Sequence, residues 1–387
     1  MDRASFAVLL SPTGQLALST AMALAPSEST FLTCFGQMAK RYERDLARAA
    51  LETALLRARA AAKFSRAEQM FFLREALEQA SSEAVARHRA ASLLRRLGSR
   101  PRLLDLGCGI GGDTLALAAV AEVTAVDSDG LRLALAEQNV RAYEVTATFH
   151  EGDGLKLDLP AEVVFVDPDR RVGGRRQLSF DACEPMLSAV RQRFTQQAIV
   201  AKLAPGVPEK EVRLLGGEAE YVSLAGELKE CLWWSPALAT ARLRATVLPS
   251  GETIACDHPV SPPPADAPGE WLIDPGPAIT RAGLVGELAQ RLCAWPLEPG
   301  IAYLSADQWT PTPFARAWRI RAALPLHLAT LRDLLRQQGI GRINLMRRGV
   351  PHDSEEILRK LKLQGEGVAQ VVMCPHQGKP WAIVCEA

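Results

Sequence analysis

Residues 103–113 read LLDLGCGIGGD, and this stretch constrains the fold more than any other part of the 387-residue chain. An apolar run ends in an acid, four glycines follow within six residues, and the apolar segment TLALAAV comes next. Glycine turns between a strand and a helix let the backbone approach a ligand, because glycine has no side chain and adopts left-handed conformations. The stretch therefore predicts an α/β fold with a pocket for a nucleotide-like ligand at this turn.

Short apolar runs alternate with helix-compatible segments after this turn. Strands are predicted at residues 122–126, 145–149, 162–166 and 198–203, with the last strands at 219–226 and 241–251. Residues 131–142 have helical spacing. Such alternation builds a parallel sheet with helices on both faces. The predicted class is therefore α/β, with a doubly wound Rossmann-like sheet, an N-terminal helical domain and a small C-terminal α+β domain.

Changes in composition along the chain predict four segments. They are a helical domain at 1–99, the sheet domain at 100–257, a Pro-rich linker at 258–270 and a C-terminal region at 271–387. Ser11-Pro12 is a predicted helix start and Gly98 a helix stop. Near the C-terminus, Asp353 and Glu356 have capping-box spacing, and the segment PHQGKP joins two strands into a predicted hairpin.

The cysteine spacing and the hydropathy of the chain indicate whether it binds a metal and in which cellular compartment it is expected. The eight cysteines include no CxxC pair and no metal-ligand spacing to the six histidines. Cys108, Cys374 and Cys385 lie in apolar or strand-like runs, where buried thiols are expected. We therefore expect no metal and a cytoplasmic location. No apolar run reaches the roughly 18–20 residues that cross a bilayer, so no membrane partner is expected.

The glycines also match a known fingerprint. Gly107, Gly109 and Gly112 satisfy the G-x-G-x-x-G pattern of dinucleotide-binding folds, and Asp127 follows Gly107 by 20 residues. Asp105, however, stands two residues before the first glycine, where its carboxylate would repel the pyrophosphate of a dinucleotide. S-adenosylmethionine has no phosphate and carries a sulfonium and an ammonium group. The acid therefore favours this cofactor over NAD.

Two further acids suit the same cofactor. Asp127 ends the second predicted strand and can accept both ribose hydroxyls, and Asp153 follows the third and can accept from the adenine amino group. The series DLGCGIGG, AVDSD, EGD and VFVDP resembles class I S-adenosylmethionine-dependent methyltransferases. The resemblance implies a cofactor pocket lined by Asp105, Gly107, Cys108, Gly109, Asp127, Ser128, Asp153 and Gly154.

The acceptor side is expected where the fourth strand ends, in VFVDPDRR. Asp167 and Pro168 lie at the edge where ligands bind open α/β sheets, and they are the predicted catalytic pair. Methyltransferases that act on amino nitrogens often have a second proline and an aromatic after this pair, whereas this chain has Asp169 and Arg170. Asp167 is the candidate to orient an acceptor or to act as a general base.

Basic residues near this edge are candidates for binding the substrate. The predicted set is Arg170, Arg171, Arg175, Arg176 and Lys202. Guanidiniums suit phosphate, but a solvated loop, or one paired with acids elsewhere, explains the arginines equally well. Lys202 either contacts the substrate or caps a carbonyl. Trp233 and Trp234 either stack on a base or, more commonly for such pairs, pack in the core.

Longer segments resemble a narrower family. REALEQASSEAVARHRA, YVSLAGELKE, DPGPAITRAGLVGELA, PTPFARAW and INLMRRGV…EILRKLKLQG…WAIVC are similar to bacterial methyltransferases with a C-terminal THUMP-like domain. The segment SSEAVARH is also similar to the one before the cofactor loop of trimethylguanosine synthases. That likeness implies that the last N-terminal helix lies over the cofactor pocket, with Glu83 as the residue to watch.

THUMP domains deliver RNA to a catalytic domain, so the resemblance implies an RNA substrate, with tRNA as the leading candidate. Residues 331–387 hold 9 Lys/Arg against 6 Asp/Glu, and residues 1–100 hold 15 against 9. These surpluses suit an anionic partner, although a solvated surface explains them as well. The predicted function is methyl transfer from S-adenosylmethionine to RNA. The alternatives are a small-molecule or protein acceptor, and a non-catalytic RNA-binding protein with a cofactor-binding domain.

Overall fold

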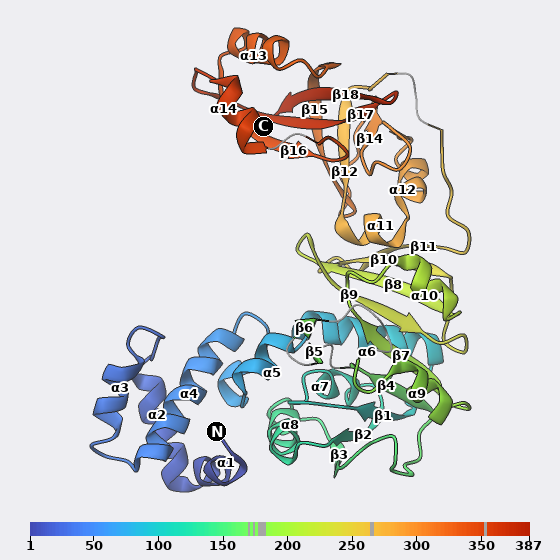
Figure 1. Ribbon diagram of the computed structural model, residues 1–387. Coiled ribbons are helices and arrows are strands. Elements are labelled where there is room, and N and C mark those ends of the chain that lie inside the picture. Colours follow the sequence, from blue (N-terminus) through green and yellow to red (C-terminus); the bar gives the residue numbers. More distant parts are fainter. Residues whose placement is uncertain (169–170, 173–174, 177–182, 264–266, 352–353) are drawn as a thin grey trace. The chain divides into compact units, whose positions relative to one another are not determined.

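The computed structural model describes residues 1–168, 171–172, 175–176, 183–263, 267–351 and 354–387. The chain divides into two compact units (Figure 1). One unit comprises Met1–Ala219 and Lys229–Thr240, and the other comprises Glu220–Leu228 and Ala241–Ala387. The four-domain division made from the sequence stays a prediction.

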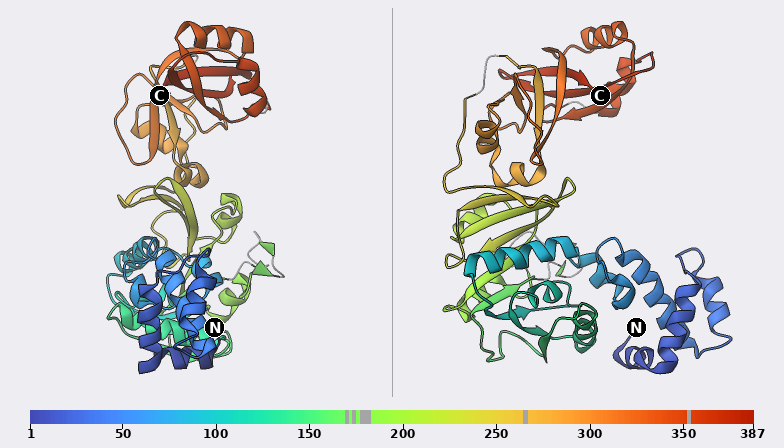
Figure 2. Two further views of the ribbon diagram at one scale, coloured as in Figure 1. Left: turned by 90° about the vertical axis from the view of Figure 1, so that its left-hand side faces the viewer. Right: turned by 180° about the vertical axis from the view of Figure 1, so that it is seen from behind.

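The N-terminal part is helical, as predicted. Its elements are α1 (Arg3–Leu10), α2 (Pro12–Ala23), α3 (Phe31–Met38), α4 (Arg44–Ala60), the 3₁₀ turn η1 (Ala67–Gln69), α5 (Arg74–Gln79) and α6 (Glu83–Leu97). Ser11 caps α2 by accepting from the Gly14 N–H, and Gly98 ends α6 with a φ of 68°. Helix α6 packs against α7 (Thr114–Leu117) in the first unit (Figure 2).

No single helix among the described residues is long and apolar enough to cross a bilayer. Helices α1 and α2 reach that length only together, and they are bent by 88° at their junction.

The central sheet has nine strands. They are β1 (Arg102–Leu106), β2 (Glu122–Asp127), β3 (Ala147–Glu151), β4 (Val163–Val166), β7 (Ala198–Leu203), β8 (Glu218–Leu224), β9 (Glu227–Trp234), β10 (Leu243–Leu248) and β11 (Glu252–Cys256). Their order is β11-β10-β8-β9-β7-β4-β1-β2-β3. Strands β3, β2, β1, β4 and β7 pair in parallel, so their carboxyl ends share one edge. This confirms the predicted α/β, Rossmann-like class.

Helices and one hairpin connect these strands. They are α7, α8 (Gly130–Ala142), α9 (Leu187–Arg193) and α10 (Glu209–Leu214), together with the short strands β5 (Arg171–Val172) and β6 (Arg175–Arg176). Asp129 caps α8 by accepting from two backbone N–H groups of its first turn, at Leu131 and Arg132. Helix α8 thereby begins directly after the carboxyl end of β2.

Strand β9 was not predicted, and it is antiparallel to β7. It carries Trp233 and Trp234, which are 1% and 0% exposed. The Trp233 indole N–H donates to the carbonyl of Gly216 at 2.6 Å. The tryptophan pair therefore packs in the core, the more common of the two interpretations made from the sequence.

The C-terminal part is an α+β fold around a seven-stranded sheet of order β13-β14-β12-β15-β18-β17-β16. Its elements are β12 (Trp271–Pro275), α11 (Pro277–Ala282), α12 (Val285–Arg291), β13 (Trp295–Pro296), β14 (Leu304–Ala306), β15 (Ala315–Pro325), α13 (Leu328–Gln337), β16 (Ile340–Arg347), α14 (Ser354–Leu361), β17 (Gly367–His376) and β18 (Lys379–Glu386). The predicted hairpin is confirmed, with Gln377 and Gly378 in left-handed conformations at its turn. Asp353 of the predicted capping box lies outside the described residues.

Both faces of this second sheet are covered along β17. Alternate residues of this strand point to opposite sides of the sheet and pack into two different apolar clusters. Val371 and Met373 pack with α13 and α14, which contribute Leu335 and Ile357 among others. Val372 and Cys374 face a second apolar cluster that includes Tyr303. The C-terminal module therefore has its own core. Cys374 and Cys385 are 0% exposed, as predicted for buried thiols.

Candidate active site

The glycine loop joins β1 to α7 at the shared carboxyl edge. Gly107, Gly109 and Gly111 have φ values of 73°, 56° and 80°, which side chains rarely tolerate. A Cβ added at Gly107 or Gly109 would meet no atom within 4 Å, so the backbone there borders open space. The N–H groups of Gly107 and Cys108 donate to the Val126 carbonyl at 2.8 and 3.0 Å. The loop is thus held against the end of β2 and leaves room for a ligand.

Asp127, at the end of β2, lies directly beside this loop. Its two carboxylate oxygens accept from the N–H groups of Gly109 at 2.8 Å and Asp129 at 2.9 Å. A carboxylate has about four acceptor positions, so each oxygen can accept one further bond. The neighbouring Ser128 is exposed. Asp127 is therefore fixed in place and still able to accept hydroxyl groups, as its predicted ribose contact requires.

Asp153 follows β3 and lies close to Asp127 along the same edge. The Gly152 N–H donates to the Asp127 carbonyl at 3.0 Å. A Cβ on Gly154 would come within 2.4 Å of Leu106, so the loop packs tightly against the end of β1. Asp153 also pairs with Lys156 at 3.0 Å, and this contact with a cation lowers the pKa of the aspartate. The structure thus brings two of the predicted cofactor acids together.

Asp105 is enclosed more completely than these acids, with 1% of its surface exposed. Its carboxylate accepts from the Thr114 hydroxyl at 2.6 Å. Burial raises the pKa of Asp105 to about 7, and the hydrogen bond from Thr114 opposes the rise. A carboxyl group this buried acts on a ligand at the loop through its charge more than by direct contact. Its predicted contact with the cofactor stays a prediction.

Asp167 and Lys202 lie at the predicted acceptor edge, at the carboxyl ends of β4 and β7. The Lys202 ammonium donates to Asp167 Oδ2, and the lysine side chain is 5% exposed. The Asp167 side chain is 28% exposed, and Pro168 beside it is buried. The structure therefore gives Lys202 an internal partner, an arrangement that neither interpretation made from the sequence included.

Several predicted residues are only partly described. Arg170 lies outside the described residues. Arg171, Arg175 and Arg176 belong to the antiparallel hairpin of β5 and β6, in which Arg171 is the backbone partner of Arg176. Cys108 is buried, and burial raises the pKa of its thiol well above the usual range. Its thiol therefore stays protonated near neutral pH.

Glu83, which the trimethylguanosine synthase likeness singled out, is the first residue of α6. Its carboxylate accepts from the Ser65 N–H at 2.6 Å and from the Tyr143 hydroxyl at 2.7 Å. Arg87 pairs with it at 2.5 Å. These bonds lower the pKa of Glu83 although burial opposes them. Glu83 therefore ties the start of α6 to the segment after α4 and to the residue that follows α8.

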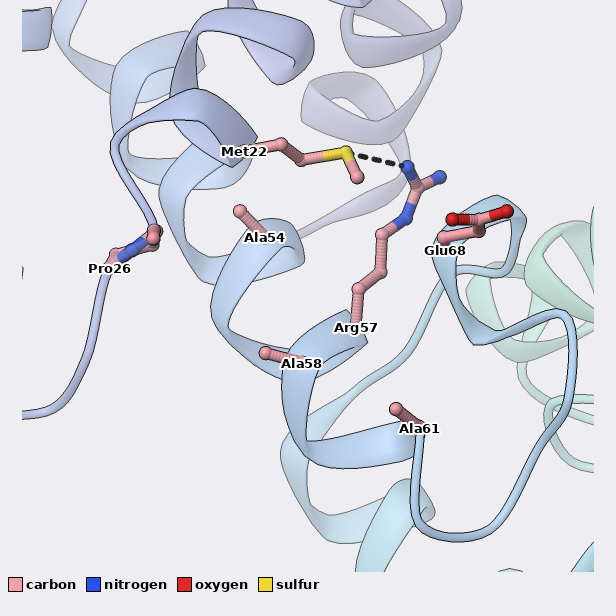
Figure 3. Close-up of a pocket in the computed structure, with 8 residues that line it drawn as sticks. Met22, Pro26, Ala54, Arg57, Ala58, Ala61 and Glu68 are labelled. Atoms are coloured by element: carbon pink, nitrogen blue, oxygen red, sulfur yellow. Dashed lines mark hydrogen bonds between the residues drawn. The ribbon is translucent and has the colours of Figure 1, made fainter.

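A cavity of about 300 Å³ lies among the N-terminal helices (Figure 3). Its walls include Met22, Ala54, Ala58 and the buried Arg57, whose guanidinium donates to the Met22 sulfur at 3.4 Å. Burial lowers the pKa of Arg57 to about 10. None of the predicted site residues lines this cavity, so it is separate from the glycine loop.

Sequence reasoning missed Arg89, Asp113 and Glu230, which form a buried ion-pair network at the end of the glycine loop. No local signal could have revealed it, because Arg89 and Glu230 lie 141 residues apart. Among the described residues, no group of three or more His, Cys, Asp or Glu side chains could hold a metal ion.

Comparison with known proteins identifies the family. The chain is 38% identical over 335 residues to an uncharacterized S-adenosylmethionine-dependent methyltransferase of Mycobacterium tuberculosis, covering 84% of this chain and 91% of the relative. The chain belongs to the S-adenosylmethionine-dependent methyltransferases. The family models that match are a methyltransferase domain at residues 103–167, a THUMP domain-like module at 315–387 and a domain of unknown function at 2–60.

A solved structure shares the fold of this methyltransferase over nearly its whole length. It is the crystal structure of a candidate methyltransferase from Porphyromonas gingivalis W83, with a TM-score of 0.76 and 19% identity, covering 96% of this chain and 98% of that one. At this identity, the likeness concerns the fold alone.

The residues at the loop fit S-adenosylmethionine. Open backbone at Gly107 and Gly109 leaves room for a ligand, and Asp127 keeps acceptor positions beside it. The Asp153 carboxylate, whose pKa is lowered by Lys156, adds negative charge along the same edge, which suits a cationic cofactor. The methyltransferase therefore uses S-adenosylmethionine as its cofactor, and the individual contacts of these residues stay predictions.

Proposed function

We propose that this methyltransferase transfers its methyl group to RNA, with tRNA as the leading candidate. The observation that carries the proposal is the THUMP domain-like match at residues 315–387, in the same chain as the methyltransferase domain. A module of this kind would supply RNA binding to the catalytic domain of the same chain.

The charge of the THUMP-like module supports this proposal. Residues 315–387 hold 12 Lys/Arg against 6 Asp/Glu. Arg342, Arg359 and Lys362 are exposed, and none of them has a carboxylate partner among the described contacts. They lie where α13 and α14 end and β16 begins, and Arg336 joins two of these ends by donating to the Lys362 carbonyl at 2.6 Å. Exposed cations that lack a carboxylate partner and lie together at one end of a module can bind the phosphates of RNA.

The cofactor supplies a methyl group on a sulfonium, already activated for in-line displacement. The protein therefore has to position donor and acceptor and exclude water. We assign the donor side to the glycine loop with Asp127 and Asp153. Each of these acids sits at the edge where the parallel strands end.

We assign the acceptor side to Asp167 with Pro168. Lys202 fixes Oδ2 of Asp167, while Oδ1 has no partner among the described contacts and is available to accept from an acceptor group. Arg170, Arg171, Arg175 and Arg176 follow Pro168 within eight residues and would bind phosphates of the same RNA. Because Asp169 and Arg170 replace the usual proline and aromatic, we expect backbone-directed recognition to matter more than base stacking here.

Comparing modified nucleosides in cells with and without the protein tests the proposal. Mass spectrometry of nucleosides from total RNA and from purified tRNA should show one methylated nucleoside that disappears on deletion and returns with the wild-type protein. A strain that carries Asp167→Ala should resemble the deletion. Unchanged nucleosides, with a lost methyl group on a protein or a small molecule instead, would overturn the RNA assignment.

A further inference from the structure

Arg89, in the middle of α6, connects the N-terminal helices to the cofactor loop. The side chain is 1% exposed and pairs with Asp113, which directly follows Gly112. It also donates to Glu230 of β9 at 2.6 Å and to the Ser81 hydroxyl at 3.2 Å. Its guanidinium lies 5.0 Å from the ring centroid of Phe165 in β4. One side chain thus contacts the loop, two strands and the segment before α6.

A gain in stability does not explain why these three charged side chains are buried together. The side chains of Arg89, Asp113 and Glu230 are 1%, 12% and 1% exposed, and buried ion pairs seldom add net stability because desolvation offsets their attraction. Burial lowers the pKa of Arg89, but the two carboxylates outweigh it and raise that pKa overall. Arg89 Nε and Glu230 Oε1 are buried without a hydrogen-bond partner among the described residues. A network with unsatisfied atoms is expensive.

Hydrogen bonds to the end of β2 hold the first part of the glycine loop, from Gly107 to Gly109. The network contacts the far end of the loop, beyond these bonds. Asp113 stands at the N-cap of α7, yet its side chain makes no capping bond and turns to Arg89 instead. The next residue, Thr114, binds Asp105 at the end of β1. Two consecutive residues therefore anchor the far end of the loop, one to α6 and one to the sheet.

We propose that Arg89 is a positioning residue for cofactor binding: by holding Asp113, it fixes the glycine loop in the conformation that accepts S-adenosylmethionine. Helix α6 lies outside the methyltransferase-domain match at 103–167, so the N-terminal helices complete the cofactor site. This inference depends on the established cofactor and not on the RNA proposal.

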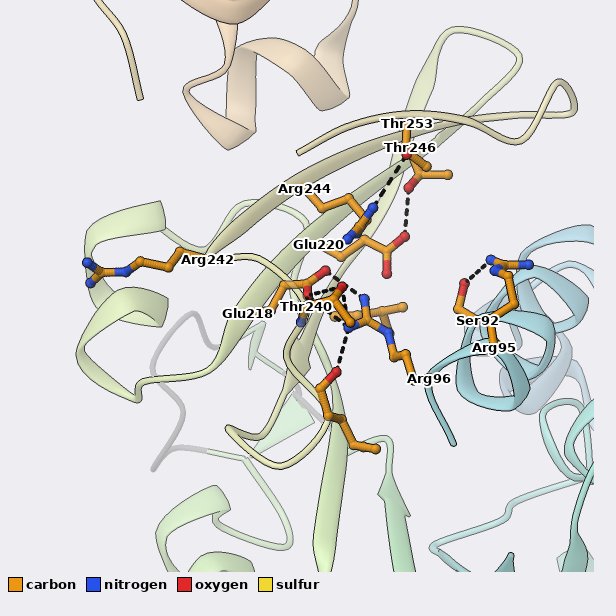
Figure 4. A network of polar contacts seen from close by, with 12 residues as sticks. Ser92, Arg95, Arg96, Glu218, Glu220, Thr240, Arg242, Arg244, Thr246 and Thr253 are labelled. Atoms are coloured by element: carbon orange, nitrogen blue, oxygen red, sulfur yellow. Dashed lines mark hydrogen bonds and ion pairs between the residues drawn. The ribbon is translucent and has the colours of Figure 1, made fainter. Parts of the chain in front are cut away.

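The same helix provides a matched control in Arg96, two turns later on the same face. Arg96 donates to both carboxylate oxygens of Glu218, at 2.6 and 2.8 Å, and to the Leu238 carbonyl at 2.6 Å. Figure 4 shows this ion pair between Arg96 and Glu218. The two side chains are 7% and 0% exposed. The two arginines therefore make comparable buried ion pairs, but none of the Arg96 contacts named here is to the glycine loop.

Titration calorimetry with S-adenosylmethionine and thermal unfolding of the cofactor-free full chain test the proposal. Arg89→Met should weaken cofactor binding by about 10-fold or more, because the loop loses its anchor. Arg96→Met should lower the melting temperature and leave the cofactor Kd unchanged. Arg89→Lys, which keeps the charge but loses the forked geometry, should give an intermediate Kd.

The double variant Arg89→Met with Glu230→Gln distinguishes the loss of loop positioning from the effect of leaving the buried Glu230 without its cation. It leaves no unpaired glutamate, so its stability should recover in part, while its cofactor Kd should stay weakened because Asp113 still lacks its partner. If Arg89→Met alone does not fold, the cofactor Kd is measured on this double variant instead. A double variant with wild-type cofactor affinity, or an Arg96→Met variant that weakens binding as much as Arg89→Met, would overturn the proposal.

Discussion

The proposed cofactor side and the proposed acceptor side of the active site are built differently. On the cofactor side, Asp127 is held by the backbone N–H groups of Gly109 and Asp129, 18 and 2 residues away along the chain. On the acceptor side, Asp167 is held by a buried ammonium from Lys202, 35 residues away. The backbone donors are fixed once β1 and β2 pair, whereas the ion pair also requires the long Lys202 side chain to adopt one conformation. Substitutions should therefore affect the two sides separately.

The largest expected effect comes from Asp167. Asp167→Ala should lower the rate of methyl transfer by about 10²- to 10³-fold, because the acceptor loses its orienting carboxylate. The Kd for S-adenosylmethionine should change by less than about 3-fold, since the cofactor side is separate. Asp158→Ala, at an exposed aspartate that pairs with Arg193 on the surface, is the control. Equal losses in both quantities would contradict the separation of the two sides.

Asp105 should make the stability of the chain depend on pH. Its pKa is about 7 when folded and near 4 when unfolded, so between these values the folded state holds one more proton. The contribution of Asp105 to the free energy of unfolding is therefore fully present below about pH 4, and it falls by about 2–4 kcal/mol as the pH rises to 7. Asp105→Asn should remove this decline. Urea unfolding of the wild type and of Asp105→Asn at pH 5 and pH 8 measures this decline. The same pH dependence of stability in both proteins would contradict a raised pKa at Asp105.

Gly109 and Gly226 form a matched pair for testing the glycine loop. Both are left-handed, with φ values of 56° and 81°, and a Cβ on either would meet no atom within 4 Å. Alanine at either position should cost about 1–2 kcal/mol of stability through backbone strain. Only Gly109→Ala should also weaken the cofactor Kd, by about 10-fold, because backbone strain displaces the N–H that orients Asp127 and the added Cβ enters the open space beside the loop. Similar affinities for the two variants would show that the loop backbone is not part of the cofactor site.

The smallest effect concerns the THUMP-like module. Replacing Arg342, Arg359 and Lys362 with alanine should lower the slope of log Kd against log salt for tRNA by up to about 3, since each phosphate contact contributes about 0.9. The control triple changes Arg319, Arg321 and Lys360, which pair with Glu270, Glu386 and Glu356. A slope that both triples lower equally would mean that net charge, and not this cluster, binds tRNA.

The parts of the molecule that the sequence predicted well depend on local chemistry. The hairpin turn at Gln377-Gly378 and the start of α2 at Ser11 each follow from residues within a few positions. The glycine loop between β1 and α7 is predictable for the same reason. Hydrophobic periodicity likewise located most strands of the central sheet. Such signals act before any tertiary contact forms.

The parts that were missed depend on contacts across the chain. The third strand was predicted at 145–149, but β3 begins at Ala147, which is the backbone partner of Val123 in β2. Strand β15 was not predicted, although Arg319 and Arg321 alternate with apolar residues in the period of two that indicates a half-buried strand.

The buried charges of the active site were the least predictable feature. Arginine on a helix is usually solvent-exposed, so Arg89 and Arg96 gave no sign of their buried carboxylate partners. Lys202 was recognised as lying at the ligand edge, but its pairing with Asp167 depends on the neighbouring β4 and β7. Only three-dimensional proximity shows which charges compensate one another.

Transfer of label from methyl-labelled S-adenosylmethionine to purified tRNA tests the central claim most directly. The purified full chain should place label in the RNA fraction, digestion with nuclease and phosphatase should release it as a single methylated nucleoside, and Asp167→Ala should abolish it. Protein that binds S-adenosylmethionine normally yet leaves total RNA unlabelled, or labels only protein or a small molecule, would contradict the assignment of RNA as the acceptor.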